Sequence, residues 1–346
     1  MSLLSYSGVT TKVRAMSGKL LQQKDYHNLC TVASVQEYVN YIKKCPAYTP
    51  IFATINIDTL HRGDIEKLLT KSIYYDFSKI YRFSSARQRQ FLDLYFLRFQ
   101  VQIIKSLMRM IFDHRDPELN LDLYQDFFMK HSKMNLSRLT SSTNIHELIE
   151  HLKGTVFYQP LNKLEIIEHP TIFDYEMQLD LFYFVTIYNN CSKHLSGDDL
   201  LLIKNSFGIQ IDLLNIQWIY RSKKYLNLSS TDLINIIIPI DYKLKHHQIR
   251  KLIESESLSE FEQLLRDTFY GNKFEIIENY SLEDAFGKLQ RNLNKLDCRK
   301  NPYSVAVIKA YLYNKENEVQ KLTTTLECIR YGYDPKDIEQ YLQTEV

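Results

Sequence analysis

The sequence predicts an all-α protein made of three similar helical-bundle domains. The chain of 346 residues contains only 9 Gly and 8 Pro, so it is poor in the residues that end helices and form tight turns. Apolar residues recur every three or four positions over long stretches, which is the spacing of one helix face. A chain of this length has room for two or three domains, and two patterns occur in it three times.

The first pattern is a long amphipathic stretch that returns in two weaker copies. The three copies are Leu94–Arg109, Ile211–Arg221 and Asn317–Arg330. When Ile103 is aligned with Asn215 and Lys321, the copies lie roughly 110 residues apart, which is the size of a domain rather than of a solenoid repeat.

The second pattern lies upstream of the first in each copy. It consists of an aliphatic residue followed two positions later by a glutamate: Val35 and Glu37, Ile145 and Glu147, and Leu258 and Glu260. The two patterns shift along the chain together. They therefore predict three units, which we place at residues 1–116, 117–228 and 229–346.

The first unit ends in the longest predicted helix. Its helices are expected from Ser7 to about Leu29, Ser34 to Cys45, Asp64 to Phe83, and Ser84 or Ser85 to Phe112. Ser34 with Glu37 has the spacing of a capping box, and residues 49–58 are expected to connect two helices, with extended backbone as one option. The last helix would be about 40 Å long.

The second and third units repeat this order. Helices of the second unit are expected from about Leu121 to Lys130, Thr143 to Lys153, Phe173 to Asn190, and Ser196 to about Lys224. Those of the third are expected from about Glu256, from Ser281 to about Asp297, from Pro302, where proline suits the first helical position, and after Pro335. Polar breaks are expected at Asp113–Asn120, Leu226–Asp232 and Tyr270–Lys273.

The charge balance favours protein partners. Forty-three basic residues against 41 acidic ones leave a formal charge of +2, so the chain has no net field for a nucleic acid backbone or an anionic membrane surface. The chain has five cysteines, an odd number, and no CxxC motif. This predicts reduced thiols inside a cell. We expect no signal peptide and no membrane insertion, because every apolar run is too short.

Motifs for catalysis, cofactors and metals are weak or absent, and we predict none of these sites. The sequence has no GxxxxGK[ST], GxGxxG or GxSxG, and such motifs need glycines to cradle phosphate or expose a nucleophile. His114-Arg115-Asp116 precedes Asn120 by one residue too few for a kinase catalytic loop. His146 and His151 are five positions apart, whereas a zinc-binding helix needs four, and adjacent His246 and His247 diverge.

Six polar residues of the long stretches are the candidate functional positions: Arg109, Asp212, Asn215, Arg221, Glu318 and Arg330. Arg109 and Arg221 lie six positions after their aligned residues, whereas the third copy has Glu327 there and Arg330 three positions later. The recurring Glu and Arg residues would serve either as a binding code or as internal contacts. Internal contacts are favoured because the residues recur within every unit.

Several segments taken together resemble the C subunit of the A/V-type rotary ATPases, the counterpart of the d subunit of the eukaryotic V-ATPase. They are VRAMSGKLL from Val13, DLYFLRFQVQIIKSLMR from Asp93, IDLLNIQWIYR from Ile211, and NEVQKL with the later IRYGYDPKDI. The resemblance covers essentially the whole chain. It departs from the family pattern at Gln100, where the first copy usually has Asp, at Ile103, where it usually has Asn, and at Lys321 and Thr323.

The resemblance implies a funnel of three helical domains about a pseudo-three-fold axis. It also implies a non-catalytic socket, peripheral on the cytoplasmic face of the membrane, that couples central-stalk subunits of the D/F type to the membrane rotor ring in one copy per complex. Two other interpretations remain: an all-helical adaptor unrelated to rotary ATPases, and an enzyme with an unfamiliar site. The long repeat period argues against a peptide-binding solenoid.

Overall fold

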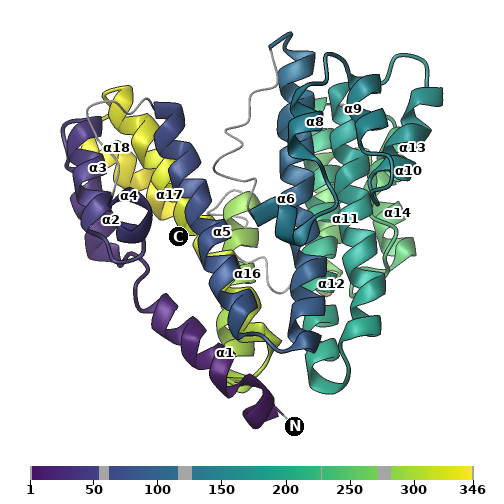
Figure 1. Ribbon diagram of the computed structural model, residues 1–346. Coiled ribbons are helices and arrows are strands. Elements are labelled where there is room, and N and C mark those ends of the chain that lie inside the picture. The colour runs from purple at the N-terminus through teal and green to yellow at the C-terminus, as the bar shows by residue number, and fades with distance from the viewer. Residues whose placement is uncertain (1, 54–61, 116–126, 227, 272–281, 345–346) are drawn as a thin grey trace. The chain divides into compact units, whose positions relative to one another are not determined.

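The computed structural model describes residues 2–53, 62–115, 127–226, 228–271 and 282–344 (Figure 1). The described residues form helices and contain no strand, so the predicted all-α class is confirmed. The chain forms two compact units. Unit 1 consists of Met1–Arg89, Asp122–Phe127 and Arg291–Val346, and unit 2 of Gln90–Leu121 and Phe128–Gln290. The division into three domains remains a prediction.

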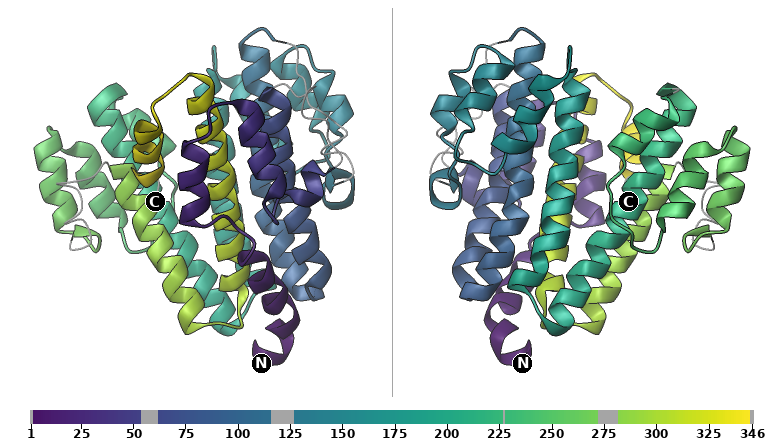
Figure 2. Two further views of the ribbon diagram at one scale, coloured as in Figure 1. Left: turned by 90° about the vertical axis from the view of Figure 1, so that its left-hand side faces the viewer. Right: turned by 90° about the vertical axis from the view of Figure 1, so that its right-hand side faces the viewer.

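Unit 1 brings the beginning and the end of the chain together. Its helices are α1 (Ser2–Ser17), α2 (Gln23–Cys30), α3 (Val35–Lys44), α4 (Thr49–Phe52), α5 (Arg62–Phe83), α17 (Val305–Arg330) and α18 (Pro335–Thr344). Helix α17 packs against α1, α2, α3 and α5 (Figures 1 and 2). Most of its side chains are buried, so α17 forms the centre of this unit.

Unit 2 contains most of the remaining helices. They are α8 (Leu136–Thr140), α9 (Ile145–His151), α10 (Tyr158–Asn162), the 3₁₀ helix η2 (Lys163–Ile166), α11 (Ile172–His194), α12 (Gly197–Arg221), the π-helical turn η3 (Ser222–Leu226), α13 (Ser230–Ile236), α14 (His246–Glu254) and α15 (Leu258–Arg266). Helices α6 (Ala86–Phe112) and α16 (Leu282–Lys300) each contribute residues to both units. The long pair α11 and α12 lie side by side.

The three predicted short helices begin with the same capped turn. The N-cap side chains of Ser34, Asn144 and Ser257 accept hydrogen bonds from the backbone N–H groups of Glu37, Glu147 and Glu260. Each of these glutamates in turn accepts from the backbone N–H of Ala33, Thr143 or Glu256. The recurring glutamates therefore satisfy free donors at the start of their own helices, and this contact within the helix accounts for their recurrence without a binding code.

Some predicted boundaries were wrong. The segment Ser7 to Leu29 is two helices, because the Leu21 N–H donates to the Glu318 carboxylate instead of to a helical carbonyl. The long helix expected from Pro302 begins at Val305, where Ser304 is the N-cap and accepts from the Ala306 N–H.

Two predicted connections contain helix. The segment expected to connect helices from residue 49 begins with α4, and the polar break at Leu226–Asp232 ends at the first residues of α13. Parts of several predictions lie outside the described residues. They are the end of the connection at 49–58, the end of the break at Asp113–Asn120 with Asp116 and Asn120 of the kinase-like motif, the start of the helix from Leu121, position 227, the end of the break at Tyr270–Lys273, and the first position of the helix from Ser281.

A glycine inside α12 allows a close contact. A Cβ atom at Gly208 would lie 2.4 Å from Cγ of Tyr242, so only glycine leaves room for this ring on the helix. The Tyr242 hydroxyl also donates to Asn205 on the same helix. Together these contacts hold the non-helical segment before α14 against α12.

Candidate functional site

The middle of helix α12 carries two fully buried polar side chains. Oδ2 of Asp212 accepts hydrogen bonds from the backbone N–H groups of Lys243 and Leu244, both at 2.9 Å, and from the Tyr270 hydroxyl at 2.7 Å. One turn later, Asn215 donates to the Ile238 carbonyl at 3.1 Å and accepts from its N–H at 2.9 Å. The segment between α13 and α14 is not helical, and these two side chains supply hydrogen-bond partners for backbone N–H and C=O groups that would otherwise be bonded within a helix.

The Asp212 carboxylate has an unusual electrostatic environment. Burial raises its pKa from 3.8 to about 6, although the hydrogen bonds from Tyr270, Leu244 and Lys243 act in the opposite direction. Its other oxygen, Oδ1, is buried and has no hydrogen-bond partner in the described part of the chain. Proton uptake at Oδ1 would leave the three bonds to Oδ2 in place.

Glu318 plays a similar part in the middle of helix α17. It accepts hydrogen bonds from the Leu21 N–H and the Tyr48 hydroxyl, both at 2.7 Å, and from Nζ of Lys315 at 3.1 Å. The Lys315 amine lies 3.7 Å from the centroid of the Tyr48 ring. Burial lowers the pKa of Lys315, and the neighbouring Glu318 carboxylate opposes this shift. Helix α17 is thereby bonded to the start of the chain.

Gln100 on helix α6 is the third residue at this position, because it lies three residues before Ile103 as Asp212 and Glu318 lie before Asn215 and Lys321. Its side chain is buried and donates to Oγ of Ser132, which also accepts from the Met134 N–H. We refer to these as the Gln100, Asp212 and Glu318 contacts.

The three contacts bind comparable backbone positions. Met134, Leu244 and Leu21 are all buried, and each lies two residues before the first residue of a short helix: α8, α14 and α2. In the Asp212 and Glu318 contacts the carboxylate accepts directly from that backbone N–H. In the Gln100 contact, Ser132 lies between the helix side chain and the N–H.

Three buried aromatic residues follow the short helices α3, α9 and α15: Tyr48, Phe157 and Tyr270. Tyr48 and Phe157 are the N-cap residues of α4 and α10. The backbone N–H of Phe157 donates to the hydroxyl of Thr155, two residues earlier, and the backbone N–H of Tyr270 donates to the hydroxyl of Thr268 in the same way. The two tyrosine hydroxyls donate to the acids Glu318 and Asp212. The third aromatic residue, Phe157, has no hydroxyl, and the third residue of the long-helix position, Gln100, is not an acid. This pairing leaves no tyrosine hydroxyl without a partner at these positions.

A further carboxylate joins helix α5 to α17. Asp76 is buried, accepts from the Tyr311 hydroxyl at 2.7 Å and forms an ion pair with Lys79 at 3.1 Å. The sequence reasoning missed this residue, as it missed Lys315, Tyr48 and Tyr270. The two tyrosines were detectable as aromatic residues about a dozen positions after Val35 and Leu258.

The three predicted arginines lie on the surface. Arg109 pairs with Glu176 on α11, one turn from the 2.6 Å ion pair between Lys105 and Asp180. Arg221 and Arg330 are exposed, and all three arginines lie in the last turn of a long helix. Cations are favoured there by the helix dipole. The six candidates thus separate into three buried residues, Asp212, Asn215 and Glu318, and three exposed arginines.

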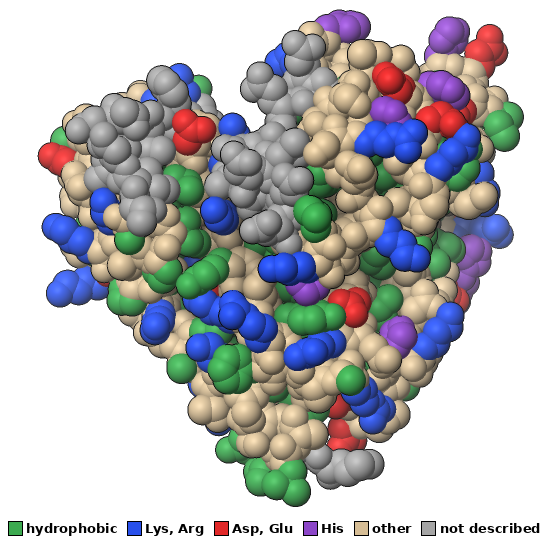
Figure 3. All heavy atoms as spheres, viewed as in Figure 1, with side chains coloured by type: hydrophobic (Ala, Val, Ile, Leu, Met, Phe, Trp, Pro, Cys, Tyr) green, Lys and Arg blue, Asp and Glu red, His purple; other side chains and the backbone are tan. Residues whose placement is uncertain are grey.

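The histidines of the weak motifs have ordinary partners. His146 contacts Glu165 at 2.6 Å and His151 contacts Ser142 at 2.9 Å, while His246 and His247 are exposed on α14. Among the described residues no group of three or more His, Cys, Asp or Glu side chains is placed to hold a metal ion. On the face in Figure 3, basic side chains are interspersed with others and form no continuous basic block.

The helices and their contacts define an all-α protein in which long helices are bonded through buried polar side chains to the turns of short helices. None of the described helices is both long and apolar enough to cross a bilayer.

Comparison with known proteins agrees with the resemblance seen in the sequence. A model of the ATP synthase (C/AC39) subunit family matches residues 9–341, and the chain belongs to this family. It is 22% identical to the C subunit of the A-type ATP synthase of Methanosphaera stadtmanae, covering 93% of this chain and 83% of that protein. It is 25% identical to the C subunit of the A-type ATP synthase of Pyrococcus abyssi, covering 97% and 89%. The predicted family, that of the C subunit of the A/V-type ATPases, is confirmed.

Proposed function

We propose that the chain is a non-catalytic central-stalk subunit of an A/V-type ATPase or ATP synthase. It would act as a socket that joins the rotating stalk to the membrane rotor ring during ATP-driven ion transport. The relatives are named as C subunits of A-type ATP synthases, and the similarity extends over most of both chains. The proposal includes three repeated domains, at residues 1–116, 117–228 and 229–346, and one copy per complex.

The observation that carries the proposal is the Glu318 contact within unit 1. Glu318 near the end of the chain binds Leu21 and Tyr48 near its beginning. A subunit that transmits torque has to resist separation of its segments under load. Hydrogen bonds to a charged acceptor contribute about 1.5–3 kcal/mol each, and a buried charge that loses its partners is costly. Such a contact stabilises the unit against opening at the chain ends.

The six candidate polar residues have a structural part in this proposal. Asp212, Asn215 and Glu318 hold the short helices to the long ones. Arg109, Arg221 and Arg330 lie in the last turns of the long helices. They contribute less, because an exposed cation at a helix end is worth about 1 kcal/mol or less, and so is the exposed ion pair of Arg109 with Glu176. None of the six is proposed to act on a substrate.

The proposed partners are stalk subunits of the D/F type and the rotor ring, with the chain peripheral on the cytoplasmic face of the membrane. A bridging assay tests this directly. Immobilised, detergent-solubilised rotor ring is mixed with stalk subunits in the presence and absence of the purified chain. We expect the ring to retain stalk subunits only when the chain is present. A chain that binds neither component would contradict the proposal and favour an unrelated adaptor.

A further inference from the structure

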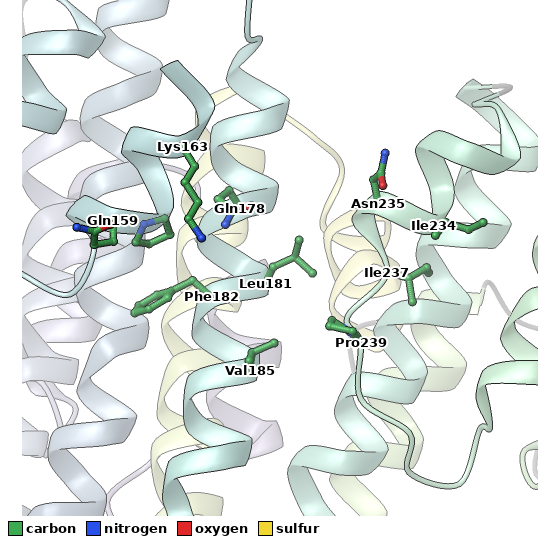
Figure 4. Close-up of a pocket in the computed structure, with 11 residues that line it drawn as sticks. Gln159, Lys163, Gln178, Leu181, Phe182, Val185, Ile234, Asn235, Ile237 and Pro239 are labelled. Carbon is green, nitrogen blue, oxygen red and sulfur yellow. The ribbon is translucent and has the colours of Figure 1, made fainter. Parts of the chain in front are cut away.

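Unit 2 has a groove of 510 Å³ along one side of helix α11 (Figure 4). Its walls come from α10, η2, α11 and the segment around α13. Leu181, Phe182 and Val185 form the apolar side on α11, and Ile237 and Pro239 lie on the opposite wall. Figure 4 shows Leu181 and Val185 pointing across the groove toward the segment that carries Pro239.

Helix α11 has more apolar surface than its own unit covers. Its buried residues include Leu179, Tyr183 and Ile187. Gln178, Leu181, Phe182 and Val185 have the spacing i, i+3, i+4, i+7 of a second helical stripe, which is apolar except at Gln178, yet they are only half-buried. A helix that is apolar on more than one face is normally covered on each of them. The second stripe spans about 10 Å, or two helical turns.

One basic side chain, that of Lys163, lines the groove. Lys163 extends from η2 into it, as Figure 4 shows, and no carboxylate in the described part of the chain pairs with it. The other polar side chains of the lining are the neutral amides of Gln159, Gln178 and Asn235. An apolar trough with an unpaired cation at its side is complementary to an amphipathic helix that has a carboxylate at the edge of its apolar face.

We propose that this groove binds an amphipathic helix of another subunit of the ATP synthase, with an apolar stripe against Leu181 and Val185 and a carboxylate against Lys163. The identity of the occupant as a subunit of that complex rests on the proposed function. A helix fits because the α11 stripe presents side chains at helical spacing on one side of an open channel, and Ile237 and Pro239 present apolar side chains on the other.

Photo-cross-linking in the assembled complex tests the groove. The photoreactive amino acid p-benzoylphenylalanine is placed at Leu181, and at Leu201 as a control, because Leu201 is 68% exposed on the surface of α12 outside the groove. We expect light to join position 181, and not position 201, to a helical segment of one other subunit that contains an acidic residue. Equal cross-linking at both positions, or a cross-link to a second copy of this chain, would overturn the proposal.

Charge reversal gives an independent readout on the same complex. Lys163→Glu is compared with Lys193→Glu, which reverses an exposed charge in the last turn of α11. We expect Lys163→Glu to weaken retention of the chain about tenfold and Lys193→Glu to leave it unchanged. Equal retention of both variants overturns the groove proposal while leaving the proposed function intact. Failure of the unmodified chain to co-purify with the complex overturns both.

Discussion

The Tyr48 hydroxyl donates a 2.7 Å hydrogen bond to the carboxylate of Glu318, which lies 270 positions later in the chain. Both side chains are buried, and Lys315 lies against the same carboxylate and over the same ring. One acidic side chain thus joins the first and last parts of unit 1. Comparable bonds join Asp212 to Tyr270 and to the turn before α14.

Removal of the Glu318 carboxylate is expected to destabilise the chain strongly. In Glu318→Ala the buried Lys315 amine loses its anionic partner and the Leu21 N–H loses its acceptor, so the free energy of unfolding should fall by about 3–5 kcal/mol. Urea denaturation measures the change. Gln320→Ala, an exposed substitution on the same helix, should change stability by less than about 0.5 kcal/mol. A loss below about 1 kcal/mol in Glu318→Ala would show that the contact is not important for stability.

The difference between the aromatic residues provides a test of the three-fold repetition. Tyr270→Phe should cost about 1–3 kcal/mol, because Asp212 loses a buried donor. Phe157→Tyr alone should also destabilise, because Phe157 is buried and the added hydroxyl would be taken out of water. In the double variant Gln100→Glu with Phe157→Tyr, the new acid and the new hydroxyl should pair.

A double-mutant cycle measured by urea denaturation gives the coupling. We expect a favourable interaction energy of about 1 kcal/mol between the substitutions at positions 100 and 157. Additive effects would show that the Gln100 contact is not equivalent to the Asp212 contact, and would count against three repeated domains.

Asp212 predicts a specific pH dependence. Its pKa is raised from 3.8 to about 6 by burial, so between about pH 4 and pH 6 the folded chain binds more protons at this residue than the unfolded chain. The contribution of Asp212 to the free energy of unfolding should therefore fall as the pH rises through this window, by at most a few kcal/mol.

The free energy of unfolding is measured as a function of pH for the unmodified chain and for Asp212→Asn. The asparagine keeps an oxygen acceptor for Tyr270 and Leu244 but does not titrate. The stability of the unmodified chain minus that of the variant should decrease from about pH 4 to about pH 6 and be flat above about pH 7. Parallel stability curves across the range would contradict the raised pKa.

Local features of the fold were predictable from the sequence because their causes lie within a few residues. The apolar period predicts the long helices, and Ser34 with Glu37 predicts the capped start of α3. The family was predictable because several segments together resemble it. Tertiary contacts overrode local preference at Leu21, where the bond to Glu318 interrupts a helical pattern that continues in the sequence.

The candidate site was only partly predictable. Asp212 and Glu318 were found because they occupy the same aligned position of the long stretches, and Asn215 because it lies three residues after Asp212, but their partners were not found. Tyr48 and Glu318 lie 270 positions apart and come into contact only in the folded chain, so neither their residue types nor their spacing predicts the hydrogen bond. The arginines recur as visibly as the acids, yet they lie at helix ends on the surface, so recurrence alone did not separate buried contacts from exposed charges.

The proposed coupling role is tested most directly by ion transport in a reconstituted ATPase complex prepared with and without the chain. ATP hydrolysis by the catalytic head and ATP-driven ion uptake into vesicles are measured on the same preparations. We expect the complex without the chain to hydrolyse ATP but to transport no ions, and addition of the purified chain to restore transport. Undiminished ATP-driven ion transport without the chain would contradict the proposed function.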